Sequence, residues 1–159
     1  MFHFISIIIP IAVLLPNLFF FVLSPSNLPG NMGDKESLFF KMSEGIGRLG
    51  VFILPILSSI HHKEYHEVLS LIGMSIFLLL YYIGWVRYFR QGRDYKLLFS
   101  PMIGIPVPLA ISPILYFICA SVVLHSPLLF LSSLLFAIGH IPVSLKTYQQ
   151  INNNNIYKK

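Results

Sequence analysis

Long apolar runs alternate with short polar segments along the 159 residues of the chain. Each run is long enough, or nearly so, to cross a hydrocarbon core about 30 Å thick as an α-helix, which rises about 1.5 Å per residue. We predict helices over residues 2–23, 38–60, 68–89, 107–124 and 127–148. The expected fold is therefore all-α, a polytopic membrane helix bundle with five transmembrane helices.

The segment between the third and fourth runs has a different character. Residues 97–108 are apolar but contain Pro101, Gly104, Pro106 and Pro108. A proline disfavours helical conformation in the residue before it, and irregular backbone at membrane depth must be buried in protein or line a cavity. We expect an interfacial or re-entrant segment packed against the helices.

These elements form one transmembrane helical domain, residues 1–148, followed by a polar tail, residues 149–159. The tail has no apolar periodicity, so we expect it to be frayed and cytoplasmic. We do not expect the first run to be a cleaved signal peptide, because no lysine or arginine precedes it and no small-x-small pattern follows it.

The composition agrees with a lipid-facing exterior. Hydrophobic residues make up 55% of the chain, charged residues 11%, and the mean hydropathy is +0.75. A soluble domain ordinarily carries about 25% charged residues. This excludes a water-soluble globular class and makes the lipid bilayer the first partner of the chain.

Positive charge gathers at the ends of the apolar runs. With five spans, all lysines and arginines but Lys63 fall on one side, namely Lys35, Lys41, Arg48, Arg87, Arg90, Arg93, Lys96, Lys146, Lys158 and Lys159. The positive-inside rule then predicts a plasma (inner) membrane protein with its N-terminus outside and its C-terminus cytoplasmic, facing anionic lipids. Nucleic acid is not an expected partner, because the cations are not interleaved with aromatic stacking platforms.

A literal G-x-G-x-x-G occurs at residues 45–50. A dinucleotide fingerprint requires a strand before the glycines and a helix after them, whereas helical pattern surrounds these glycines on both sides. Ser43, Gly47 and Gly50 share one helical face, where small side chains let another helix approach closely. We interpret the motif as a helix-packing face.

Four polar residues inside the predicted spans are candidate functional groups. Glu44 and Arg48 are spaced i, i+4, and either form an interfacial salt bridge or line a polar pocket in which Arg48 contacts an anion. His140 stands beside helix-perturbing residues and is either a functional group or a neutral histidine bonded to Asn17 or Tyr81. Asn17 is also placed to bond a backbone carbonyl freed by the neighbouring proline.

Three arginines end the third run: Arg87, Arg90 and Arg93. They either orient the protein and contact anionic headgroups, or join Arg48 in a site for a phosphorylated lipid. Trp85 and Tyr88 beside them are typical of an aromatic belt at the membrane surface.

Three histidines lie in the outer connector: His61, His62 and His66. His62 and His66 would share a helical face and bind zinc or copper, or the imidazoles would respond to pH between about 5 and 8, or the connector is simply solvated. Neither HExxH nor HxxEH is present, so metalloprotease motifs are absent. We expect no resident cofactor apart from a divalent metal at this loop.

No nucleophile stands at a fixed spacing from a base, and no paired acids or phosphate loop occur. With prolines in four of the five runs, we expect a non-enzymatic small transporter or channel component, or an accessory subunit that contacts other membrane subunits or its own copies. The alternative is a membrane-embedded enzyme acting on lipid headgroups at the cytoplasmic face.

Overall fold

The computed structural model describes residues 4–27 and 37–156 of the chain. Its α-helices are α1 (Ile8–Val22), α2 (Leu38–Ile53), α3 (Tyr65–Arg90), α4 (Pro108–Val123) and α5 (Pro127–Ile156), joined by the short 3₁₀ helices η1 (Phe4–Ile7), η2 (Leu54–Leu57) and η3 (Tyr95–Leu98). Within these residues there is no strand, and one isolated bridge joins Met102 to Ile105. The predicted all-α class is confirmed.

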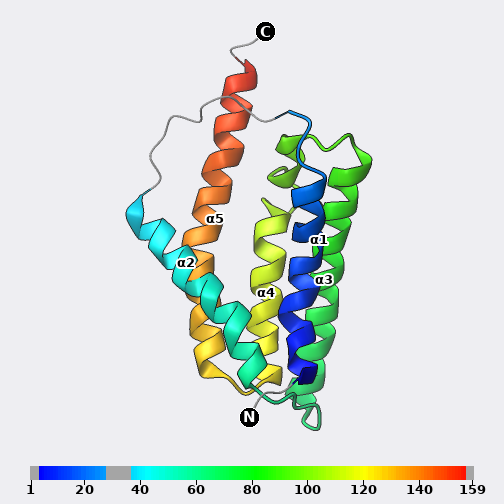
Figure 1. The fold of residues 1–159 in the computed structure, drawn as a ribbon, viewed down its shortest axis with the longest axis vertical. Coiled ribbons are helices and arrows are strands. Elements are labelled where there is room, and N and C mark those ends of the chain that lie inside the picture. Colours follow the sequence, from blue (N-terminus) through cyan, green and yellow to red (C-terminus); the bar gives the residue numbers. More distant parts are fainter. Residues whose placement is uncertain (1–3, 28–36, 157–159) are drawn as a thin grey trace.

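Successive helices run in alternating directions along the long axis of the molecule (Figure 1). Helix α4 packs between α3 and α5, α2 crosses α5 obliquely, and α1 lies beside α3 (Figure 1). Residues 58–64 and 124–126 meet at one end, where the His61 amide donates to the Val123 carbonyl at 2.8 Å. We call this the histidine end. The opposite arginine end joins residues 23–27 to residues 91–107, with the Ser26 amide donating to the Arg93 carbonyl at 3.1 Å.

Three of the described helical stretches are long and apolar enough to cross a membrane: Ile5–Val22, Tyr65–Arg90 and Pro127–Asn153. Helix α4 is apolar but has 16 residues, which corresponds to about 24 Å. Helix α2 also has 16 residues and continues through the four residues of η2. The described chain thus has three helices of full membrane-spanning length and two shorter ones.

Several boundaries differ from the sequence prediction. Helix α3 begins at Tyr65, three residues early, because the side chains of Glu64 and Glu67 form a reciprocal capping box at its amino end. Helix α2 gives way to η2 after Ile53, and Pro55 lies in the first turn of η2. Helix α5 continues through residues 149–156, where the sequence predicted a separate frayed tail. The last three residues of that tail lie outside the described residues.

Residues 97–108 form an irregular cap over the arginine end. The segment contains the end of η3, the bridge between Met102 and Ile105, and backbone in the left-handed region at Ile103, Gly104 and Val107. Pro108 then opens α4, consistent with the preference of proline for the first helical turn.

Tyrosine hydroxyls attach α1 to the bundle. Pro16 has no amide hydrogen, so the Ala12 carbonyl lacks its helical donor. The Tyr82 hydroxyl of α3 donates to this carbonyl at 2.8 Å. Asn17, which we expected at a freed carbonyl, instead donates to the Val13 carbonyl and to the Tyr81 hydroxyl, both at 3.1 Å.

Helices α2 and α5 approach each other very closely. The Ser43 hydroxyl donates to the Leu135 carbonyl at 2.8 Å. A Cβ atom added at Gly47 would lie 2.2 Å from the Phe136 amide nitrogen, and one added at Gly50 would lie 2.2 Å from the Ser132 hydroxyl. The face formed by Ser43, Gly47 and Gly50 is therefore turned toward α5.

The expected aromatic belt at the membrane surface is wrong for the residues that suggested it. Trp85 is 6% exposed and Tyr88 is fully buried, so both lie inside the bundle. Their rings form an edge-to-face pair with centroids 5.6 Å apart, and both also contact Phe20 of α1. These rings stabilise the attachment of α1 to α3.

Candidate functional site

Glu44, Arg48 and His140 form a charged cluster between α2 and α5. The Nδ1 atom of His140 lies 3.1 Å from Oε1 of Glu44, and the Arg48 guanidinium forms a salt bridge with the same oxygen. The side chains of Glu44 and His140 are 18% and 25% exposed, whereas that of Arg48 is 52% exposed. Glu44 is thus paired on two sides, and Arg48 keeps an exposed face.

The close helix crossing makes this cluster possible. A Cβ atom at Gly139 would lie 2.5 Å from the Glu44 amide nitrogen, so α5 carries no side chain at the point where α2 crosses it. This approach puts the next residue, His140, within hydrogen-bond distance of Glu44. Asn17 and Tyr81, which were predicted to bond His140, do not do so. The Asn17 amide donates to the Tyr81 hydroxyl, and this hydroxyl donates to the Val13 carbonyl of α1.

The His140 ring is fixed on its other side by aromatic packing. It stacks on Phe136 with ring centroids 4.8 Å apart, and the Arg48 guanidinium carbon lies 5.8 Å from the centroid of the same Phe136 ring. Cation–π contact of this kind holds an arginine without consuming all five of its donors. Arg48 is therefore held by Glu44 and Phe136 and retains N–H donors that neither of these contacts uses.

A cavity of about 460 Å³ adjoins the cluster. Its polar wall is contributed by Arg48, His140, Asn17 and Ser144. Most of the remaining wall is aliphatic or aromatic, from Val13, Leu14, Phe20, Phe21, Phe52, Tyr81, Trp85, Leu98, Phe99, Leu109, Ala110, Pro113, Phe117 and Phe136. A volume of this size, mostly apolar with a few polar groups, is typical of small-molecule sites.

The exposed part of the cavity wall lies on α1 and α2. Leu14 and Phe21 of α1 are 37% and 80% exposed, and the Arg48 side chain of α2 is 52% exposed. The wall contributed by α3 and α4 is buried: Trp85 is 6% exposed and Phe117 is fully buried. The exposed lining residues of the cavity therefore belong to α1 and α2, and most of its lining from α3 and α4 is buried.

One donor in the cavity wall has no partner. The indole N–H of Trp85 is buried and makes no hydrogen bond with any described residue. The nearby Tyr81 hydroxyl interacts with the indole, but its hydrogen bonds of good geometry are with Asn17 and the Val13 carbonyl. A buried donor without a partner costs about 1–3 kcal/mol, which a bound acceptor would recover. Nothing in the sequence pattern pointed to this atom.

The arginines at the end of α3 do not join Arg48. Arg87 donates to the Pro101 carbonyl at 3.0 Å, and Arg93 lies beyond the helix end in a left-handed turn. The cavity wall includes neither of these residues, nor Arg90. The combined site for a phosphorylated lipid that the sequence offered as an alternative is therefore not formed.

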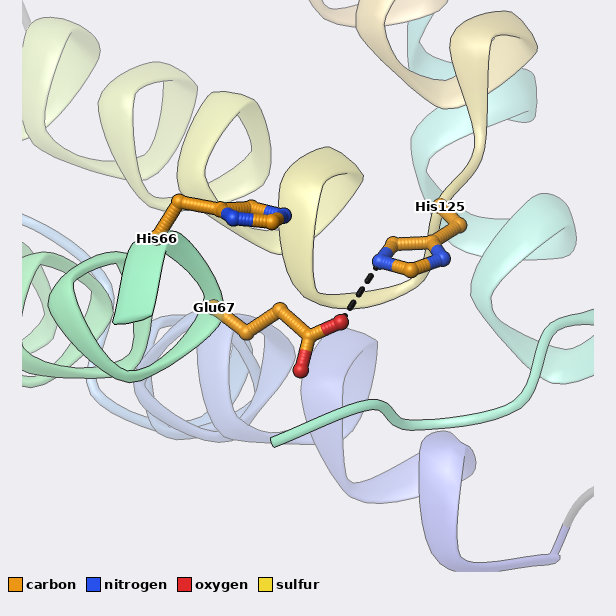
Figure 2. A group of neighbouring side chains, drawn as sticks. All are labelled: His66, Glu67 and His125. Atoms are coloured by element: carbon orange, nitrogen blue, oxygen red, sulfur yellow. Dashed lines mark ion pairs between the residues drawn. The ribbon is translucent and has the colours of Figure 1, made fainter. Parts of the chain in front are cut away.

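The connector histidines are separated by the start of α3. His61 and His62 precede Tyr65, where the helix begins, so His62 and His66 do not share a helical face as expected. His66 instead lies near Glu67 and His125, as Figure 2 shows, and the His61 ring stacks on His125 with centroids 4.2 Å apart. The sequence pattern did not connect His125 with the other histidines, because it is 59 residues away from His66 along the chain.

Comparisons of the chain with protein families, with curated proteins and with solved structures gave no match.

Proposed function

We propose that the chain is a multi-pass protein of the plasma (inner) membrane that binds an amphipathic anion in the cavity beside Arg48, as a non-enzymatic transporter component or accessory subunit. The membrane assignment rests on large apolar side chains that are exposed on the long helices. Ile8, Leu79 and Leu128, from α1, α3 and α5, are all more than 60% exposed. In water such a surface would drive aggregation, whereas lipid solvates it.

The five-pass arrangement, N-terminus outside and C-terminus inside, is supported by the alternating helix directions and by charge. Lys63 is the one lysine or arginine among the described residues at the histidine end, whereas Arg87 and Arg90 in the last turn of α3 and Arg93 and Lys96 just after it cluster at the arginine end. The cytoplasmic leaflet attracts cations. Helices α2 and α4 are short for a full span, and a locally thinned bilayer or the flanking turns accommodate the difference.

The observation that carries the ligand assignment is the cavity itself. Its mostly apolar wall suits a hydrocarbon chain, and its exposed lining residues on α1 and α2 would face lipid. Arg48 and His140 belong to its polar wall, so a carboxylate or phosphate bound there would meet the guanidinium. His140 lies at the middle of the apolar stretch Pro127–Asn153, which is the depth at which many transporters bind substrate.

Photocrosslinking tests this assignment. A C16 fatty acid and the fatty alcohol of equal length, each carrying a diazirine, are offered to the protein in phosphatidylcholine nanodiscs, and labelled peptides are mapped by mass spectrometry. We expect the acid to label α1, α4 and α5 more strongly than the alcohol does. Arg48→Gln should reduce acid labelling at least tenfold, because a hydrogen bond to a charged group contributes about 1.5–3 kcal/mol.

Arg90→Gln is the matched control, because it removes the same charge from an exposed position outside the cavity wall. It should leave labelling unchanged. Equal labelling by acid and alcohol in the wild type would reject an anionic ligand, and an equal effect of the two variants would reject the cavity as its site.

The second candidate, an enzyme acting on lipid headgroups, is favoured by the contact between His140 and Glu44. A carboxylate that holds an imidazole beside a guanidinium is an arrangement used in general acid–base catalysis. Incubation with mixed phospholipids separates the two functions. Recovery of every lipid at unchanged mass supports a binding or transport role, and headgroup conversion that is lost in His140→Gln supports the enzyme.

A further inference from the structure

Three metal-ligating side chains converge at the histidine end, and none of them lines the cavity. His66 and Glu67 come from the first turn of α3, and His125 comes from the turn between α4 and α5 (Figure 2). One ligand atom from each residue lies within 4.8 Å of the other two. The same end carries only one lysine, Lys63, and no arginine among its described residues.

The carboxylate in this group is fixed in position before any ion binds. The Oε2 atom of Glu67 accepts hydrogen bonds from the Lys63 and Glu64 amides at 2.6 and 2.9 Å. Its Oε1 atom is turned the other way, toward Nε2 of His125 at 2.7 Å. The Glu67 side chain is only 2% exposed. Backbone amides that orient a carboxylate in this way are the usual outer support of a metal ligand.

The imidazole from the opposite turn is also held in place. His125 has a left-handed backbone with φ of 47°, and its ring nitrogen Nε2 faces Glu67 of α3. The His61 amide anchors this turn through the Val123 carbonyl at 2.8 Å, and the His61 ring lies flat on the His125 ring with an interplanar angle of 3°. The rings of His66 and His125 remain accessible to solvent, so an ion can enter from the aqueous side.

We infer that His66, Glu67 and His125 bind a divalent transition-metal ion of the zinc or copper class at the outer end of the bundle. Two imidazole nitrogens and one carboxylate oxygen suit these ions, whereas Mg²⁺ and Ca²⁺ prefer sites built from oxygen alone. Ligand atoms around a tetrahedral ion with bonds near 2.0–2.1 Å lie about 3.3 Å apart. The His125 and Glu67 ligand atoms, 2.7 Å apart, must therefore separate by about 0.6 Å as the ion enters between them. The exposed side chain of His66 can rotate to bring its ring nitrogen to the ion.

Three protein ligands leave a fourth position on a tetrahedral ion for water or for a rotated His61. The set differs from the one that the spacing of the connector histidines predicted, because His125 and Glu67 replace His61 and His62. His62 is exposed and is not part of the group, so it provides a control from the same connector.

Titration of ZnCl₂ into the full-length protein, purified in detergent through a tag without histidine, tests the site by calorimetry. We expect one Zn²⁺ per chain and no displacement by a hundredfold excess of Mg²⁺. His66→Ala and His125→Asn should each weaken binding at least tenfold, since loss of outer-shell support alone costs about 10–100-fold. Asparagine at position 125 tolerates the left-handed backbone, so the turn is retained.

His62→Ala should keep the wild-type affinity within about twofold. Absorption spectra of the Co²⁺-loaded protein give a second readout, because tetrahedral coordination produces intense visible bands that His66→Ala should abolish. Fluorescence melts of each variant show whether it remains folded. Absence of saturable Zn²⁺ binding would overturn the inference, and so would a loss of Zn²⁺ affinity in His62→Ala equal to that in His66→Ala.

Discussion

Replacing Gly47 by alanine should destabilise the protein although alanine is the better helix former. The glycine lies where α2 crosses α5, and an added Cβ atom would be 2.2 Å from the Phe136 amide nitrogen, 2.6 Å from its Cα and 2.8 Å from its Cβ. Two of these three atoms are backbone, so no side-chain rotation relieves the contact. The helices must separate instead.

The size of the effect follows from that separation. Ordinary contact begins at about 3.4 Å, so the two backbones must move apart by about 1 Å. Overpacking of this kind costs about 1–3 kcal/mol.

Gly45 is the matched control, because it lies on the same helix and a Cβ atom there meets nothing within 4 Å. Both variants gain the same helix propensity, about 0.8–1 kcal/mol, so the difference between them isolates the crossing.

The assay is a thermal melt in detergent followed through the fluorescence of Trp85, the one tryptophan of the chain, which is buried in the core. A difference of 1–3 kcal/mol corresponds to roughly 2–12 °C in Tm for a chain of this size. Gly45→Ala should melt at or above the wild-type temperature and Gly47→Ala below it. Equal melting temperatures for the two variants would refute the close crossing, and with it the placement of the Glu44 cluster.

Two further outcomes are expected. Tyr82→Phe removes the hydroxyl that donates to the carbonyl freed by proline in α1, and it should lower the free energy of unfolding by about 0.6–2 kcal/mol in the same melt. Tyr65→Phe, at a side chain that is 82% exposed, should leave the stability unchanged. An equal loss of stability in the two variants would contradict the role of the Tyr82 hydroxyl. In a Cys119→Ala background, a cysteine replacing His62 should react with an impermeant maleimide in intact cells, and one replacing Asn153 only after permeabilisation. Labelling of both positions in intact cells would rule out the proposed orientation.

The sequence determined the helical class and the approximate extent of the helices. Apolar runs of this length leave the backbone no hydrogen-bond partner in lipid except itself, so the fold class follows from composition and run length. The sequence also indicated the positions of small residues along α2, because a three-to-four-residue spacing on a helix fixes which side chains share a face. Helix ends were less accurate, since the capping box of Glu64 and Glu67 and the helical course of residues 149–156 depend on side-chain geometry and local context.

Only the tertiary structure decided which polar groups meet. His140 bonds Glu44, 96 residues away, and His125 bonds Glu67, 58 residues away. Neither pair has a spacing that a local pattern could detect. The first pair depends on how closely α2 and α5 cross, which the absence of side chains at Gly47 and Gly139 allows. The second pair depends on the conformation of the turn between α4 and α5, where His125 has a left-handed backbone. Local pattern determines which faces are apolar, whereas the contacts between those faces depend on the packing of the whole bundle.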